Sequence, residues 1–106
     1  ALLQAGTVET SYVRAGSGSP VLLLRRGSLG EMAGSEILRT LAARFRVTGA
    51  VPPENLDEGW LRDLIDGLGL DRPHVVADAA FASFLRRFAT SHPERVAGVE
   101  ILESRL

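Results

Sequence analysis

One short stretch, residues 73–88, limits most strongly what this chain can fold into. Residues 73–76 have the apolar, β-branched composition of a buried strand, and residues 77–80 are typical of a sharp turn. Phe84, Leu85 and Phe88 then recur at the spacing of one helix face. A strand that passes directly into a helix is half of a βαβ unit. We therefore expect a parallel sheet with helices packed on it.

The rest of the chain continues this alternation of strands and helices. The continuous apolar run at residues 21–24 predicts a strand that is covered on both faces. Ser35 and Asn55 are candidate N-caps for two further helices. The expected elements are one outer, antiparallel strand within residues 1–18, strands 21–24, 46–51, 73–76 and 98–102, and helices 35–45, 55–69 and 82–91. This order predicts a three-layer αβα fold with a mostly parallel sheet of about five strands.

Length and charge exclude several classes of function. The 106 residues are enough for one domain, residues 1–106, with a single thin core. The formal net charge is −1, with 12 Lys plus Arg against 13 Asp plus Glu, so the basic excess of a nucleic-acid-binding protein is missing. The chain has no cysteine and only two histidines, which are far apart in the sequence. We expect no metal and no cofactor.

The same composition bears on location. No apolar run reaches the 18 residues that a membrane-spanning helix needs, and the first residues lack a secretory signal pattern. We expect no membrane partner, and the absence of cysteine favours a cytoplasmic protein.

Four segments, in order along the chain, resemble the α/β-hydrolase family. They are residues 15–24, 41–47, 68–76 and 92–98. They are similar to the hairpin and strand before the oxyanion segment, a helix-to-strand passage, the strand leading to the nucleophile elbow, and the turn after the elbow helix. The resemblance covers most of the chain and implies a reduced α/β-hydrolase core.

The residues at the elbow depart from the family's pattern. The family needs G-x-S-x-G, with glycines that relieve a strained turn and a serine that presents its hydroxyl group. Without gaps, Ala77, Ala79 and Phe81 take the places of Gly, Ser and Gly. The resemblance therefore implies that the nucleophile is missing, because Ala79 has no nucleophilic atom.

Asp78 is the alternative candidate at this turn. Some members of the family use aspartate as the nucleophile, and Asp78 matches if the alignment shifts by one residue. The structural alternative is that Asp78 caps the following helix near its positive N-terminus. The sequence favours the capping role.

The oxyanion segment also differs from the family. Arg26 and Gly27 stand where the family has His-Gly, and Ser28 follows. The resemblance makes residues 26–28, with Asp78 and Ala79, the candidate ligand-binding residues. The strands that end at Arg26 and Asp78 are neighbours in the family, so one hypothesis is that these two side chains pair at the top of the sheet. The other is that each charge is solvated separately.

The histidines and the end of the chain argue against the family's triad. His74 begins its predicted strand and His92 follows a helix, whereas sites of such sheets form at the carboxyl ends of strands. The family's acid and histidine would follow on two further strands. The sequence ends at Leu106, so we expect both to be missing.

Three interpretations of function remain open. The first is a non-catalytic, truncated α/β-hydrolase-like protein that acts as a binding or interaction module. A homodimer is one hypothesis within it, formed either by pairing of the last strand, residues 98–102, or by packing of the uncovered sides of the helices. The second is a small hydrolase that cleaves an ester or a halide through Asp78, with Ser28 or Ser83 as further candidates. The third is a fragment or engineered miniature of a longer hydrolase.

Overall fold

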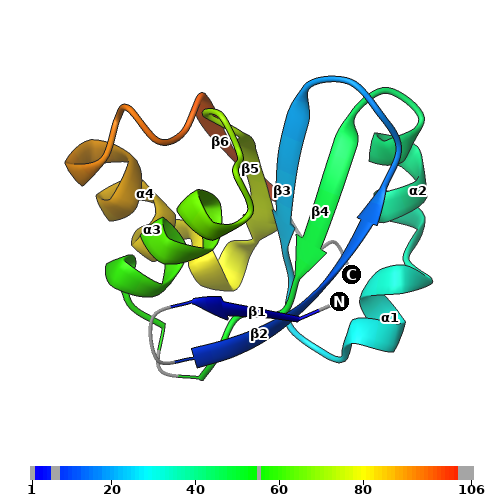
Figure 1. Cartoon of the computed structure of the whole chain (residues 1–106), viewed down its shortest axis with the longest axis horizontal. Coiled ribbons are helices and arrows are strands. Elements are labelled where there is room, and N and C mark those ends of the chain that lie inside the picture. The colour runs from blue at the N-terminus through cyan, green and yellow to red at the C-terminus, as the bar shows by residue number, and fades with distance from the viewer. Residues whose placement is uncertain (1, 6–7, 55, 103–106) are drawn as a thin grey trace.

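A computed structural model describes residues 2–5, 8–54 and 56–102, which form a six-stranded sheet between two layers of helices (Figure 1). The strand order is β1-β2-β4-β3-β5-β6. The strands are β1 (Leu2–Ala5), β2 (Val8–Ala15), β3 (Pro20–Leu24), β4 (Arg46–Ala50), β5 (His74–Asp78) and β6 (Gly98–Leu102).

The sheet is parallel from β4 through β3 and β5 to β6, as predicted. We predicted one outer strand before residue 18, but this segment forms two strands, β1 and β2, which pair with each other antiparallel. Strand β2 also pairs antiparallel with β4. The strand before the turn is also longer than residues 73–76, since β5 ends at Asp78.

Within the described residues, four α-helices and one 3₁₀ turn connect the strands. They are α1 (Leu29–Ala33), α2 (Glu36–Ala42), α3 (Glu58–Gly67), η1 (Ala79–Phe81) and α4 (Ala82–Ser91). The cap of α2 was predicted correctly, because the Ser35 hydroxyl accepts a hydrogen bond from the Leu38 amide. The cap of α3 is Asp57, whose carboxylate accepts from the Trp60 amide at 2.8 Å. The predicted cap, Asn55, lies outside the described residues.

Helix α1 was not predicted. It has one buried apolar residue, Met32, and five residues give too little periodicity to recognise. The signal in the sequence is its capping box. The Ser28 hydroxyl accepts from the Glu31 amide, and the Glu31 carboxylate accepts from the Ser28 amide.

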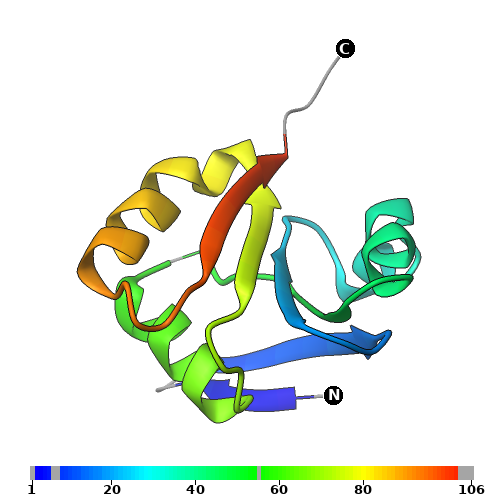
Figure 2. The same cartoon turned by 90° about the horizontal axis from the view of Figure 1, so that it is seen from above.

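The helices cover the two faces of the sheet separately, as Figure 2 shows with α1 and α2 on one side and α3 and α4 on the other. Strand β3 explains the arrangement. Leu22 and Leu24 pack in the core with α3 and α4, whereas Val21 and Leu23 pack in the core with α1 and α2. A strand in the middle of a parallel sheet is apolar on both faces for this reason.

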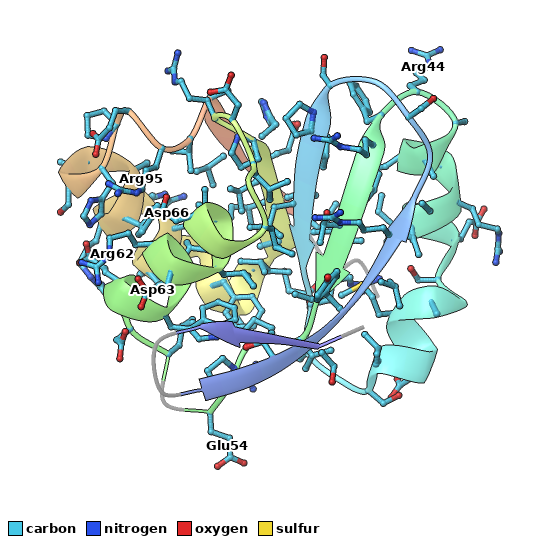
Figure 3. All side chains as sticks on the ribbon, in the orientation of Figure 1. Arg44, Glu54, Arg62, Asp63, Asp66 and Arg95 are labelled. Atoms are coloured by element: carbon cyan, nitrogen blue, oxygen red, sulfur yellow. The ribbon has the colours of Figure 1, made fainter. Side chains whose placement is uncertain are left out.

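An ion pair outside the core holds α3 to the segment before β6. Arg95 donates from Nε and from a terminal nitrogen to the two carboxylate oxygens of Asp66, at 3.3 and 3.1 Å, and Figure 3 shows the two side chains together. The hydrogen bond with Asp66 raises the pKa of Arg95, with Glu94 contributing. The pair is exposed, so it orients the loop more than it stabilises the fold. None of the described helices has the length and apolar character needed to cross a membrane.

One buried hydroxyl group gives a test of the core. Thr48 is 1% exposed in β4, and its Oγ1 has no hydrogen-bond partner among the described residues. We expect Thr48→Val to raise the free energy of unfolding by about 1 kcal/mol, because an unpaired polar group leaves the core. Urea denaturation measures this change.

Thr10 is the matched control for this substitution. It is 3% exposed, and its Oγ1 accepts a hydrogen bond from the Trp60 indole N–H at 2.9 Å. Thr10→Val should therefore destabilise the fold, because it leaves the indole N–H unpaired. Equal losses of stability at both positions would contradict the assignment of the Thr48 hydroxyl as unpaired.

Candidate functional site

The candidate site lies where β3 and β5 end side by side. The parallel register places Leu24 opposite Ala77, so the residues that follow each strand meet at the same edge of the sheet. Parallel α/β sheets bind their ligands at this carboxyl edge. Asp78 is the last residue of β5, and Arg25 and Arg26 are the first residues after β3.

Both carboxylate oxygens of Asp78 have partners from the segment after β3. Arg25 Nε donates to Asp78 Oδ1 at 3.0 Å, and the Arg26 backbone N–H donates to Asp78 Oδ2 at 3.2 Å. The side chains of Arg25 and Asp78 are 38% and 25% exposed, so solvent reaches the pair. The carboxylate of Asp78 is therefore held by one charged and one neutral donor.

The hypothesis that the Arg26 side chain pairs with Asp78 was wrong, although Asp78 does form an ion pair at this edge of the sheet. It is Arg25, not Arg26, whose guanidinium binds Asp78. Leu24 and Ala77 face the core with α3 and α4, so the next residues, Arg25 and Asp78, turn to the opposite face. The Arg26 guanidinium instead lies 5.8 Å from the centroid of the Phe81 ring.

The backbone of the turn after β5 is ordinary. Asp78 has φ −63° and ψ 155°, and the chain then enters η1. Among the described non-glycine residues, positive φ occurs at Arg72 alone, which lies before β5. The turn thus lacks the left-handed strain that a nucleophile elbow uses to expose its side chain. Asp78 precedes η1, but its side chain makes no capping hydrogen bond, so the predicted capping role was wrong.

The three residues in place of the glycines and serine differ in environment. Ala77 is fully buried in β5 and Phe81 is 6% exposed. Ala79 is exposed at the start of η1 and presents only a methyl group. Small size at Ala77 serves packing, because this residue belongs to the core with α3 and α4.

Residues 27 and 28 form the turn into α1. Gly27 has φ +114°, and a Cβ atom there would lie 3.3 Å from the Glu31 carboxylate, so this position requires glycine. The Ser28 hydroxyl is engaged as the N-cap of α1. Ser83, the other serine candidate, is exposed on α4.

The histidines lie at the other end of the sheet. His74 is the first residue of β5, and its Nε2 is 4.0 Å from Glu100 Oε2. His92 follows α4, and its Nε2 is 3.5 Å from Glu58 Oε1. Neither is a partner of Asp78. Within residues 2–5, 8–54 and 56–102, no three acidic or histidine side chains gather in a way that could hold a metal ion.

Two cavities are relevant to binding. One of about 150 Å³ lies beside the site and is lined by Arg25, Arg26, Glu31, Met32 and Ser35. A larger one of about 470 Å³ lies at the amino ends of β3 and β5, beside Pro20 and His74. Small-molecule sites usually exceed about 300 Å³. The space beside Asp78 is thus smaller than a typical substrate pocket.

Comparisons with solved structures identify the architecture. A serine hydrolase involved in carbazole degradation superposes with TM-score 0.80 and 22% identity, over 100% of this chain and 48% of that one. A mutant epoxide hydrolase from Bacillus megaterium gives TM-score 0.79 and 17% identity, over 97% and 42%. A mutant meta-cleavage product hydrolase from Pseudomonas fluorescens IP01 gives TM-score 0.79 and 22% identity, over 93% and 43%.

The present chain thus spans about half the length of these structures. No protein-family model matches the sequence, and no curated protein matches it either.

Proposed function

We propose that this chain, which has the α/β-hydrolase fold, is a non-catalytic protein that acts by binding. The observation that carries the proposal is the state of Asp78, whose two carboxylate oxygens are both hydrogen bonded to the segment after β3. A nucleophilic carboxylate must offer an oxygen to the substrate. Here each Asp78 oxygen already accepts a hydrogen bond, one of them from a charged guanidinium, which stabilises the carboxylate and makes it a weaker nucleophile.

The surroundings of the turn support the same conclusion. Ala79 has no group that can attack a carbonyl, and the Ser28 hydroxyl caps α1. Nucleophilic catalysis by a hydroxyl needs a base within about 3 Å. The described histidines pair with Glu100 and Glu58, away from this edge of the sheet.

The binding surface that we propose consists of residues 26–28 with Asp78 and Ala79. The Arg26 guanidinium is exposed beside Phe81, and Ala79 is exposed at the start of η1. A small polar ligand suits the neighbouring cavity of about 150 Å³. A cytoplasmic location stays a prediction from the absence of cysteine.

One observation favours the second candidate function, a hydrolase that uses Asp78. The Arg26 backbone N–H points at Asp78 Oδ2. Backbone donors at this edge of the sheet stabilise negative charge that develops during acyl transfer. Cleavage of an ester or a halide would still need an Asp78 oxygen to attack while it accepts a hydrogen bond from Arg25 or from the Arg26 amide. The third interpretation, that this chain is a fragment or engineered miniature of a longer hydrolase, stays a separate proposal, because the matched hydrolases are about twice as long.

Ester turnover separates the two functions. We expect the wild-type chain and Asp78→Asn to hydrolyse p-nitrophenyl acetate at the same rate, equal to that of buffer with an inert protein. The same comparison with a bromoalkane, followed by bromide release, tests halide cleavage. Turnover by the wild type that falls at least tenfold in Asp78→Asn would overturn the non-catalytic proposal and make Asp78 the nucleophile. Circular dichroism of both proteins controls for folding.

A further inference from the structure

The cavity of about 150 Å³ beside the site is built from one short part of the chain. Its walls extend from the turn after β3, through α1, to the N-cap of α2. The lining residues are Arg25, Arg26, Glu31, Met32 and Ser35. A water molecule occupies about 30 Å³ in the liquid, so the cavity has room for about five waters or for one small polar molecule.

Arg25 supplies hydrogen-bond donors to this cavity. Its Nε donates to Asp78 Oδ1 at 3.0 Å, which holds the guanidinium in place. Among the described residues, none accepts a hydrogen bond from the terminal nitrogens of Arg25. The edge that these nitrogens form binds carboxylates through two parallel hydrogen bonds. Arg25 is thus a positioned receptor for a carboxylate.

Glu31 supplies an acceptor to the same cavity. Its Oε1 accepts from the Ser28 amide at 3.2 Å, and its carboxylate lies over Gly27, where a Cβ atom would be 3.3 Å from either oxygen. The other oxygen, Oε2, has no hydrogen-bond partner in the part of the chain that the structure describes. Carboxylate oxygens form charge-assisted hydrogen bonds with ammonium groups. Glu31 is thus held in position with one oxygen open to a ligand.

The two charged groups line one small cavity but do not satisfy each other. No ion pair between Arg25 and Glu31 occurs in the described structure. A carboxylate ligand alone would meet the negative charge of Glu31, and an amine alone would meet the positive charge of Arg25. We propose that this cavity binds a small zwitterion, an α-amino acid such as glycine. Its carboxylate accepts from Arg25, and its ammonium group donates to Glu31.

The balance of charge at this edge of the sheet also favours a zwitterion. Two basic and two acidic side chains cancel here: Arg25, Arg26, Glu31 and Asp78. A ligand without net charge leaves that balance unchanged. Since Arg25 is 38% exposed and Glu31 is exposed, both contacts are weakened by solvent, and we expect a dissociation constant of about 1–10 mM. The inference rests on the proposed function, because it names the class of ligand for the cavity next to Asp78.

Amide chemical shifts of the isotope-labelled chain, measured by NMR, test the proposal with glycine as the probe. The Ser28 amide donates to Glu31 and the Arg26 amide donates to Asp78, so these two signals report on the two charged ends of the cavity. We expect glycine to shift both signals at constant ionic strength. Acetate and methylammonium carry one charge each, and each should bind about tenfold more weakly than glycine.

Glu31→Gln tests the acidic end without removing the cap of α1, because glutamine can still accept from the Ser28 amide. The variant loses the negative charge. We therefore expect it to bind glycine about tenfold more weakly than the wild type and to bind acetate more tightly. Glu36→Gln is the matched control, because Glu36 is exposed in the first turn of α2 and does not line the cavity. It should leave the binding of both probes unchanged.

Arg25→Lys tests the basic end. Lysine keeps a positive charge for Asp78, but its single ammonium group has no second edge to offer to a carboxylate. We expect this variant to bind glycine about tenfold more weakly than the wild type, with the other amide signals of the folded chain retained.

Three results would overturn the inference. Glycine at about 100 mM shifts neither amide, acetate shifts both as strongly as glycine, or Glu31→Gln binds glycine as the wild type does. Shifts with acetate would still show binding at this edge, so the proposed function would survive the loss of the zwitterion. Turnover that depends on Asp78 is measured with other substrates, so a failure of the proposed function is distinguishable from a failure of this inference.

Discussion

Replacing Phe88 by alanine is expected to lower the free energy of unfolding by about 3–5 kcal/mol. Phe88 is fully buried in α4, within the core that α3 and α4 form against the sheet. Its ring stacks on Phe84 at 6.4 Å and contacts the His92 ring at 4.7 Å between centroids. Truncation removes the apolar surface and leaves a cavity that the sheet cannot fill. The total free energy of unfolding of a native protein is only about 5–15 kcal/mol, so this single loss is a large part of it.

Urea denaturation measures the loss at Phe88, with the single tryptophan as the probe. Trp60 is 3% exposed and lies in the same core, so its fluorescence reports the transition. Phe45→Ala is the control, because Phe45 is only partly buried at the margin of the other core, and it should cost less than half as much. Equal losses at the two positions would mean that the α3–α4 core is not the main source of stability.

Gly16→Ala is expected to lower the free energy of unfolding by about 3 kcal/mol or more. Gly16 has φ +80°, a conformation that side chains disfavour. A Cβ atom there would also collide with the backbone of Phe45 and Ala42. Backbone atoms cannot rotate out of the way, so the turn between β2 and β3 would have to separate from the end of α2. Thermal unfolding measures the change.

Gly69→Ala separates the cost of a positive φ from the cost of a collision with the backbone. Gly69 has a similar φ of +66°, but apart from its chain neighbours no atom would lie within 4 Å of a Cβ atom at this position. The variant should therefore lose only the conformational preference, about 1 kcal/mol. A loss at Gly16 no larger than that at Gly69 would show that the close approach of the turn to α2 contributes nothing.

Local spacing determines the helix that carries Phe88, whereas the close contact of Gly16 depends on the folded chain. The apolar spacing of Phe84, Leu85 and Phe88 predicted a helix at residues 82–91, and α4 has these bounds. The residues around Gly16 do not predict its contact with the backbone of Phe45, because that contact joins two turns about 30 residues apart in the sequence. Glycine in a turn was predictable, but its intolerance of a Cβ atom was not.

The candidate site was predictable in place but not in detail. The resemblance to α/β-hydrolases put residues 26–28 and Asp78 at one edge of the sheet, and they lie there. The choice between Arg25 and Arg26 depended on which face each strand end presents. Successive side chains of a strand point to opposite faces of the sheet. Arg25 follows Leu24 and Asp78 follows Ala77, so the two charged side chains point to the same face. The pairing of Leu24 with Ala77, which decides this, is visible only in the folded sheet.

The sequence by itself determined the alternation of strands and helices, the two-sided burial of β3 and the absence of a serine at position 79, because these follow from local periodicity and residue chemistry. Only the tertiary structure decided that the first strand is a hairpin, that Arg25 binds Asp78, and that His74 lies against Gly98. The last two contacts join residues that are about 20 to 50 positions apart. Their geometry is set by strand register, which depends on the packing of the whole sheet.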